Sequence, residues 1–185
     1  APCPKKHQEI MLKNLSVVEG MNLNTLLEGT QWKFESFPDY LNFIDEQRPH
    51  PNVAVLIGHS AIRTAVMGEE SSTRVIPTQE ELNTMRGIVD EAPTGGAIGF
   101  ASSFSPNHSG FGGRPMPSTI AEDAELYALL EPIKQRKGVF VTAGGGRATP
   151  EYLEHISKTF DCPTFLVSVL AMYNDSDPTA SSSYY

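Results

Sequence analysis

The stretch from Thr78 to Ala101, TQEELNTMRGIVDEAPTGGAIGFA, decides the fold. Thr78 followed by Glu81 is the pattern of a capping box, which starts a helix. The apolar residues after it are spaced as on one face of a helix: Leu82, Met85, Ile88 and Val89. The sequence APTGG at 92–96 ends this helix, and the apolar run AIGFA at 97–101 then predicts a buried strand.

The same alternation of helix and strand extends to both sides of this stretch. Further apolar runs, continuous rather than alternating, predict strands at 53–57, 139–142 and 164–170. Helical patterns lie between them, one at about 120–136 and one that starts with Thr149 as cap and Pro150 at the first position. Continuous strands covered on both faces are typical of a parallel sheet. The sequence therefore predicts an α/β fold of parallel (β/α) architecture, either doubly wound or part of a barrel.

The chain is expected to form a single α/β domain or a barrel fragment over 1–185. Residues 1–50 are a helical and aromatic lead-in, 51–175 hold the β/α units, and 176–185 are a polar tail. The lead-in predicts one helix over 12–27. Its aromatic cluster is interpreted as packing rather than ligand stacking, and its members are Trp32, Phe34, Phe37, Tyr40, Leu41 and Phe43.

Composition excludes several classes of function. The formal net charge is -8, from 14 Lys and Arg against 22 Asp and Glu, which disfavours attraction to nucleic acid or anionic lipid. No apolar run could span a membrane, so a small-molecule substrate is the expected partner.

The two cysteines, Cys3 and Cys162, have no metal-binding spacing, and no signal peptide precedes them. We therefore expect reduced thiols and a cytoplasmic location. The chain begins without Met and ends in a polar run, which indicates a fragment or a processed chain. Self-association or missing chain segments are expected as well, because the end strands of a barrel section would leave unpaired edges and exposed apolar helix faces.

Ligands of parallel α/β folds bind at the carboxyl ends of the strands, so the residues after each apolar run are the candidates. His59 and Arg63 follow the first run. His59 could be a metal ligand, a general base or a prop that orders neighbouring loops. After the last run come Met172, Tyr173, Asn174 and Asp175.

A long polar loop, SSFSPNHSGFGGRPMPS, follows the second run. It carries a candidate catalytic residue, His108, whose other interpretation is an exposed histidine. Arg114 lies between Gly113 and Pro115. Its planar guanidinium could bind a substrate carboxylate through two hydrogen bonds, or it could form a salt bridge that holds the loop in place. The further candidates for substrate binding are Arg63, Ser103, Ser105 and Ser118.

The glycine run Gly144, Gly145 and Gly146 precedes the last helix. Its backbone N–H groups could approach a small anion, although an ordinary tight turn has the same sequence signal. There is no HxH and no HExxH pair, so the chain shows no complete metal site. The GxSxG elbow of serine hydrolases is also absent, which argues against a serine hydrolase.

Two segments carry a family resemblance: GHSAIRTAVMG at 58–68 and GAIGFASS at 96–103, between a preceding PDYLNFIDEQRPHPNVAVLI and a following GRPMPS. In this order they resemble the N-acyl-D-amino-acid deacylase (D-aminoacylase) branch of the amidohydrolase superfamily, over about 37–142. The resemblance implies part of a TIM-barrel metallohydrolase in which a zinc-bound hydroxide attacks an amide.

The resemblance also implies metal ligands that this chain lacks. The family's HxH pair, a cysteine and an aspartate are absent. Where the family has a histidine after a threonine, Thr142 is followed by Ala143, and no histidine occurs near Leu170 or Ala171. Two hypotheses follow. One is an amidohydrolase-like hydrolase acting on an N-acyl amino acid or related amide, and the other is a non-catalytic α/β fragment or decayed relative that binds a small anion.

Overall fold

The computed structural model describes residues 3–30, 32–167 and 175–176 of the chain. Its strands form one sheet in the order β1-β2-β3-β4, and every pairing is parallel. Ile57 pairs with Phe100, and Phe100 pairs with Phe140. The prediction of four neighbouring parallel strands is confirmed, with residues 168–170 outside the described part. The bounds are β1 Val55–Gly58, β2 Ala97–Ser103, β3 Val139–Ala143 and β4 Thr164–Leu166.

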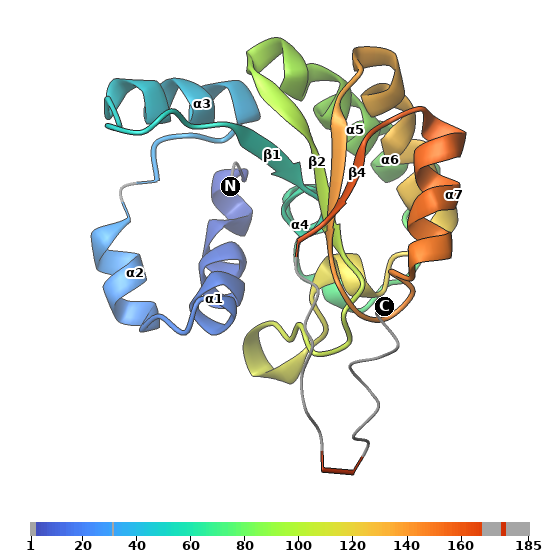
Figure 1. Cartoon of the computed structure of the whole chain (residues 1–185). Coiled ribbons are helices and arrows are strands. Elements are labelled where there is room, and N and C mark those ends of the chain that lie inside the picture. Colours follow the sequence, from blue (N-terminus) through green and yellow to red (C-terminus); the bar gives the residue numbers. More distant parts are fainter. Residues whose placement is uncertain (1–2, 31, 168–174, 177–185) are drawn as a thin grey trace.

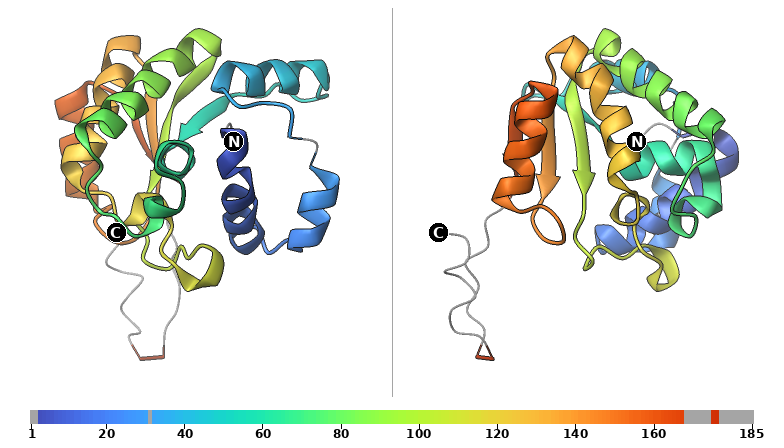
Figure 2. Two further views of the ribbon diagram at one scale, coloured as in Figure 1. Left: turned by 180° about the vertical axis from the view of Figure 1, so that it is seen from behind. Right: turned by 90° about the vertical axis from the view of Figure 1, so that its right-hand side faces the viewer.

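Helices connect the strands and cover one face of the sheet (Figures 1 and 2). Their apolar faces share one core with the sheet, in which Phe100, Phe140 and Leu129 are fully buried. Burial of such large side chains stabilises the fold by about 1.5–3 kcal/mol each. The helices are α4 His59–Met67, α5 Gln79–Glu91, α6 Asp123–Arg136 and α7 Pro150–Phe160, and short 3-10 helices lie at η2 Gly68–Ser72, η3 Ala92–Gly95, η4 Phe111–Gly113 and η5 Pro117–Thr119.

The predicted helix caps are confirmed, and one predicted boundary is wrong. Thr78 and Glu81 make both hydrogen bonds of a capping box, and the Thr149 side chain accepts from the N–H of Tyr152. Helix α6 begins at Asp123 rather than near residue 120, because Glu122 is extended and η5 occupies the preceding turn. It ends where Lys137 adopts a left-handed conformation.

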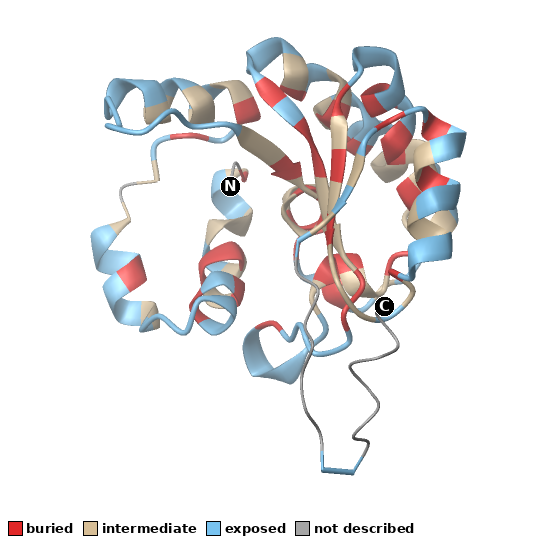
Figure 3. Cartoon of the chain, viewed as in Figure 1, coloured by how far each residue is buried: buried red, intermediate tan, exposed pale blue. Residues whose placement is uncertain are grey.

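The lead-in forms separate helices on the β1 side of the sheet, as Figure 1 shows. The prediction of one helix over 12–27 is wrong, because Gly20 has a φ of +63° and Asn22 caps a new helix. The aromatic residues pack as predicted, with the Phe34 ring 4.9 Å from Tyr40 and 5.3 Å from Phe43. Figure 3 shows that α2 and α3 are mostly exposed or half-buried. These elements are η1 Lys5–His7, α1 Gln8–Val18, α2 Leu23–Gly29 and α3 Phe37–Glu46.

The sheet is not covered on both faces, contrary to the expectation from its continuous apolar strands. Phe165 of β4 and the following Val167 are exposed. Among the described residues, no strand pairs with the outer edge of β1 or of β4. No helix in the described ranges is long and apolar enough to cross a membrane.

Candidate functional site at the carboxyl ends of the strands

The parallel pairing brings the predicted residues after β1 and β2 to one edge of the sheet. Gly58 pairs with Ala101, so His59 at the start of α4 lies beside Ser102 near the end of β2. The long loop after β2 leaves from the same edge. His59 therefore lies close to the serines at the end of β2.

His59 is buried between the sheet and the helices. Its Nε2 atom lies 2.7 Å from Glu125 Oε1 of α6, and its Nδ1 atom lies 2.9 Å from Ser102 Oγ. Because a carboxylate can only accept, Nε2–H donates to Glu125, which leaves Nδ1 to accept from the Ser102 hydroxyl. The His59 ring also lies against Phe100, with 5.4 Å between the ring centroids.

Arg63 completes this cluster and does not reach the rim. Its guanidinium is fully buried, pairs with the second carboxylate oxygen of Glu125, and donates to the Arg74 carbonyl at 2.6 Å. The prediction of Arg63 as a substrate-binding residue therefore disagrees with its position. Helix geometry explains the difference, because residue 63 stands one turn after His59 and faces α6. Its Nε atom is buried without a hydrogen-bond partner in the described structure.

The cluster has a definite charge state. Burial lowers the pKa of His59, although the hydrogen bond to Glu125 partly opposes this effect. Burial acts to raise the pKa of Glu125, but the hydrogen bond from His59 and the nearby Arg63 charge bring that pKa below its usual value. Neutral His59, ionised Glu125 and ionised Arg63 together carry no net charge, which is the arrangement that a buried site favours.

Three serines connect α4, β2 and the loop. The hydroxyl of Ser60 donates to Ser118 Oγ at 2.8 Å, and the hydroxyl of Ser118 donates to the Ser103 carbonyl at 3.1 Å. The backbone N–H of Ser118 donates back to Ser60 Oγ at 3.0 Å. Ser118 is buried, so this predicted binding residue holds the end of the loop against α4.

The loop after β2 folds on itself through a bridge between Ser109 and Pro115. Within it, Ser103 Oγ lies 2.6 Å from His108 Nδ1, and the buried Ser105 accepts from the N–H of Asn107. His108 is exposed, and its Nε2 atom makes no hydrogen bond to the described residues. His108 and Ser103 therefore form a polar pair that faces solvent at the rim.

Arg114 stands apart from the two histidines. Its guanidinium is half exposed and lies 3.7 Å from Glu69, which is a loose ion pair. It lines a cavity of about 420 Å³ together with Lys6 and Lys13, whereas His59 lines another of about 280 Å³. The placement of His59, His108 and Arg114 after strand ends predicts that they converge on one pocket, but His59 and Arg114 line different cavities, which share Asn14, and His108 lines neither of them.

The smaller of these cavities is mainly apolar and is also lined by polar residues. Helix α1 supplies Met11, Leu15 and Val18, and most of the polar residues come from β2 and α4. Ser102, His59 and Ser60 therefore face the same space as Met11 and Leu15. Such a cavity suits a small ligand with an apolar group and one reactive or polar function.

The glycine run does not form an open anion cradle. Gly145 and Gly146 have φ values of +102° and +58°, and a Cβ on Gly146 would lie 2.1 Å from the Phe104 carbonyl oxygen. The run thus lets the β3 loop approach the loop after β2. The following helix α7 is already capped by Thr149. The tight-turn interpretation of Gly144, Gly145 and Gly146 fits this geometry.

A further polar group, Arg147, directly follows this turn. The Arg147 guanidinium stacks on Phe104 at 4.4 Å from the ring centroid and lies 3.1 Å from Asp123. Asp123 also accepts from the Tyr152 hydroxyl at 2.5 Å. These contacts tie the β3 loop to α6 and α7.

Glu125 is a residue that sequence reasoning missed. It precedes Leu126 and lies four residues before Leu129, so it stands at the margin of the apolar stripe of α6. A carboxylate at that position is buried together with the apolar face of α6. This position is the signal in the sequence that could have identified Glu125 as a buried charge. Its partner could not be identified, because His59 lies 66 residues away in the chain.

The described residues do not fit a metal centre. Among residues 3–30, 32–167 and 175–176, no group of three or more His, Cys, Asp or Glu side chains is arranged to hold a metal ion. Both ring nitrogens of His59 are already hydrogen-bonded, and both cysteines are buried free thiols. Of the residues after the fourth predicted strand, 172–174 lie outside the described part.

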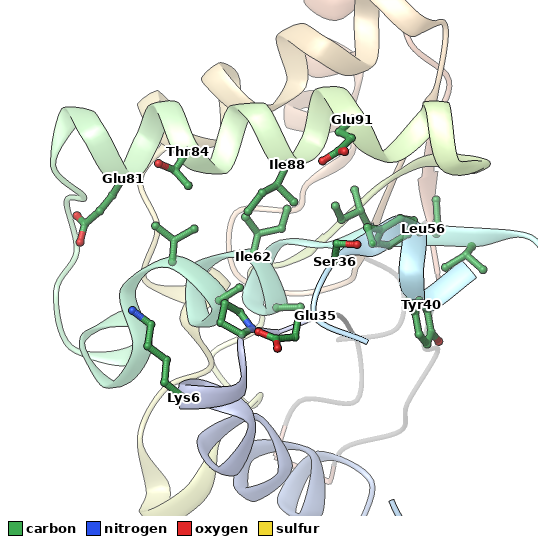
Figure 4. A pocket seen from close by; sticks show the side chains of 18 of the residues that line it. Lys6, Glu35, Ser36, Tyr40, Leu56, Ile62, Glu81, Thr84, Ile88 and Glu91 are labelled. Atoms are coloured by element: carbon green, nitrogen blue, oxygen red, sulfur yellow. The ribbon is translucent and has the colours of Figure 1, made fainter. Parts of the chain in front are cut away.

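A separate cavity of about 620 Å³ lies at the outer edge of β1 (Figure 4). Helix α5 borders it along one side and α4 and β1 along the other, with Ile62, Ile88 and Leu56 on its walls. Glu81 and Glu91 stand at its border. It contains none of the predicted site residues.

Comparison with known proteins gives related enzymes but no matching family model. The D-aminoacylase of Alcaligenes xylosoxydans xylosoxydans is 31% identical over 121 residues, which are 65% of this chain and 22% of that protein. The N-acyl-D-aspartate deacylase of the same organism is 31% identical over 108 residues, 58% of this chain and 19% of the relative. The chain thus spans about a fifth of the length of these curated relatives.

Solved structures agree with this result. Two D-aminoacylase structures each superpose with a TM-score of 0.56 over 71% of this chain and 26% of theirs, at 27% and 29% identity. One is described as defining a subset of amidohydrolases, and the other is a mutant in complex with copper chloride. Both structural neighbours are therefore D-aminoacylases, and the relatives in sequence include a D-aminoacylase and an N-acyl-D-aspartate deacylase. The parallel α/β sheet of this chain agrees with their TIM-barrel-like fold.

Proposed function

Because its relatives are D-aminoacylases, we propose that this chain carries part of an amidohydrolase-like hydrolase acting on the amide bond of an N-acyl amino acid or a related compound. The observation that carries the proposal is the similarity of about two thirds of the chain to D-aminoacylase in both sequence and structure. The polar rim at the carboxyl ends of β1 and β2 supports it, because ligands of parallel α/β folds bind there.

In this proposal His108 contacts the substrate and His59 positions the rim. His108 keeps one ring nitrogen for a ligand while Ser103 orients the other, which suits proton transfer or polarisation of an amide. His59 holds Ser102 on β2 directly beside Ser103. Ser105 and Ser118 fix the two ends of the loop that carries His108.

Arg114 is the proposed anchor for a substrate carboxylate. Its guanidinium fork can make two parallel hydrogen bonds to a carboxylate, and its ion pair with Glu69 is loose enough to be exchanged. Lys6 and Lys13 line the same cavity and add positive charge to it. An N-acyl amino acid carries such a carboxylate.

Zinc is the metal that the family resemblance implies, and the described residues do not hold it. The proposal therefore gives this chain a substrate-side role and assigns no reaction step to a metal. A cytoplasmic location is part of the proposal, supported by the two free, buried thiols. The alternative function, a non-catalytic fragment that binds a small anion at 144–146, would require the closed glycine turn to open.

Turnover assays and metal analysis test the proposal together. Release of acetate from N-acetyl-D-amino acids, or about one zinc per chain retained after dialysis, would support the hydrolase. A protein without metal and without turnover would support the non-catalytic alternative. His108→Gln should reduce turnover without changing the thermal midpoint, because its exposed ring contributes little to packing.

Calorimetric titration of N-acyl amino acids tests the role of Arg114. Arg114→Lys keeps the charge but loses the fork, so we expect binding weaker by about 1 kcal/mol, at the low end for a charged hydrogen bond because the site is half exposed. Arg86→Lys, on an exposed position of α5, is the matched control. Equal affinities in both variants would remove Arg114 from the site.

A further inference from the structure

We propose that Ser102 is an activated nucleophile, in a serine–histidine–glutamate relay that transfers acyl groups independently of any metal. The relay consists of Ser102 of β2, His59 of α4 and Glu125 of α6. The hydroxyl of Ser102 donates to His59 Nδ1 at 2.9 Å, and His59 Nε2–H donates to Glu125 at 2.7 Å. A nucleophile bonded to a base, and a base oriented by a carboxylate, are the geometric signature of covalent acyl transfer.

Burial makes this relay rigid. The side chains of His59 and Glu125 are 0% and 3% exposed, and Arg63 holds the second carboxylate oxygen of Glu125. The imidazole is therefore fixed in the tautomer that leaves Nδ1 free to receive a proton. Ser102 itself is only half-buried and lines the 280 Å³ cavity, so its hydroxyl lies where a ligand could reach it.

The same cavity contains a candidate oxyanion site. Helix α4 begins at His59, and no side chain caps it. The N–H groups in the first turn of a helix lack partners within the helix and carry partial positive charge. Ser60 and Ala61 of that turn line the cavity beside Ser102. An oxygen that becomes negative during acyl transfer would be stabilised by such donors.

The walls of the cavity indicate the substrate class. Met11, Leu15 and Val18 of α1, with Met116 of the loop, give it an apolar lining. A carboxylic ester with a short acyl chain would place its alkyl group against these side chains and its carbonyl near Ser102. Helix α1, which lines this cavity, precedes the motifs at 58–68 and 96–103 that carry the family resemblance.

Hydrolysis of the ester by this relay consumes only the ester and one water molecule. Ser102 Oγ forms a bond to the acyl carbon while its proton passes to His59 Nδ1, and the carbonyl electron pair moves onto oxygen. When the carbonyl re-forms, the bond to the leaving alkoxide breaks, and that oxygen takes the proton from Nδ1. Water then repeats the same steps on the acyl-serine and releases the carboxylic acid. Because the resting cluster is neutral, the imidazolium and the oxyanion arise together as a balanced pair.

Labelling with a fluorophosphonate probe in a buffer with a metal chelator tests the relay. We expect one adduct per chain by intact mass, located on Ser102 by peptide mapping. Ser102→Ala should abolish labelling, and it should fold, because it removes only one hydroxyl. Ser157→Ala is the control, since that hydroxyl donates to the Cys162 carbonyl and lies outside the relay.

His59→Gln and Glu125→Gln test the base and its orientation. Loss of the base should slow labelling by about 100-fold or more, with folding checked by a thermal melt. No adduct on the wild-type chain, or adducts on serines other than Ser102, would overturn the proposal, and so would an unchanged rate in a folded His59→Gln variant. If a chelator abolishes turnover of N-acetyl-D-amino acids, that result concerns only the proposed amidohydrolase-like function. The proposed function and the Ser102 relay can therefore fail separately.

Discussion

Three buried residues at the carboxyl ends of the strands, His59, Arg63 and Glu125, depend on one another. Each would be costly to bury alone, and Glu125 lowers that cost for His59 and for Arg63 by pairing with both. Glu125 is the central member, because it accepts from both of the others. Its removal would leave the fully buried Arg63 charge without a partner.

Glu125→Ala should therefore be strongly destabilising. Breaking a buried ion pair by removing one partner costs about 3–5 kcal/mol, and urea unfolding measures this loss directly. Glu131→Ala is the control, because Glu131 is exposed on the same helix and should change stability by less than about 0.5 kcal/mol. Equal effects of the two substitutions would contradict the role given to the cluster.

The depressed pKa of His59 makes stability depend on pH. Below its ordinary pKa of 6.5, the histidine binds a proton more readily in the unfolded chain than in the folded one. The stability that His59 contributes is thus complete above pH 6.5 and is lost as the pH falls towards its folded pKa. Thermal melts between pH 8 and pH 5 should show a decrease that is smaller in His59→Gln than in the wild type. A parallel decrease in both proteins would assign the effect to other groups.

At this scale the sequence predicts positions, because strand ends are recognisable from a short window of sequence. It placed His59, Ser103, Ser105, His108 and Ser118 after strand ends, and their roles in binding and catalysis stay predictions. The partners of these residues were not predicted, since Glu125 and Arg147 act through contacts between distant segments. Arg63, predicted to bind substrate, is buried against Glu125, because the direction of its side chain depends on where α6 packs.

Among the elements, helix α5 shows how local rules set a boundary. The Thr78 side chain accepts from the Glu81 N–H, and Glu81 accepts in return from the Thr78 N–H at 2.7 Å. Thr78→Ala should lower the free energy of unfolding by about 1 kcal/mol, as measured in urea. Thr84→Ala on the same helix is the matched control, and it should be neutral or slightly stabilising because alanine favours helix interiors. A loss as large in Thr84→Ala would contradict a specific capping effect.

The turn after β3 depends on Gly146 in a different way. A Cβ there would meet the Phe104 carbonyl oxygen, and a φ of +58° strains any L side chain. Gly146→Ala should therefore destabilise the chain by more than about 1 kcal/mol. Gly87→Ala in α5 has open space around it and should stabilise by about 0.5–1 kcal/mol. The difference between the thermal midpoints of the two variants measures the effect. A higher midpoint for Gly146→Ala than for Gly87→Ala would show that the loops after β2 and β3 do not pack closely.

Helix boundaries that are encoded within a few residues can be predicted from the sequence, whereas boundaries that depend on distant contacts cannot. The capping box of α5 and the Pro150 start of α7 are encoded within a few residues, and both are confirmed. The break between α1 and α2 was missed, because a single glycine is tolerated inside many helices and only its left-handed φ ends this one. The start of α6 was placed too early, because the hydrogen bonds of η5 depend on Ser60, which lies 58 residues away.

For the molecule as a whole, the described sheet has two open edges. The outer edge of β1 borders the 620 Å³ cavity with its apolar walls, and Phe165 leaves apolar surface exposed on β4. Unpaired parallel edges next to apolar surface are templates for association. A barrel removes such edges by closing the sheet on itself, which requires further strands. The similarity to about a quarter of a D-aminoacylase chain agrees with this incomplete closure.

We propose that the isolated chain self-associates through the β1 edge. Size-exclusion chromatography with light scattering should give a mass above the 20.2 kDa of one chain, increasing with concentration. Leu56→Lys places a charge on the cavity wall at β1 and should shift the population to the monomer, because a charged edge strand resists pairing. Ile76→Lys is the control, since Ile76 is exposed away from that cavity and its charge should leave the association unchanged. A mass of 20.2 kDa at every concentration would show that the edge is protected by the chain itself. Equal dissociation of both variants would instead attribute the association to general surface hydrophobicity rather than to β1.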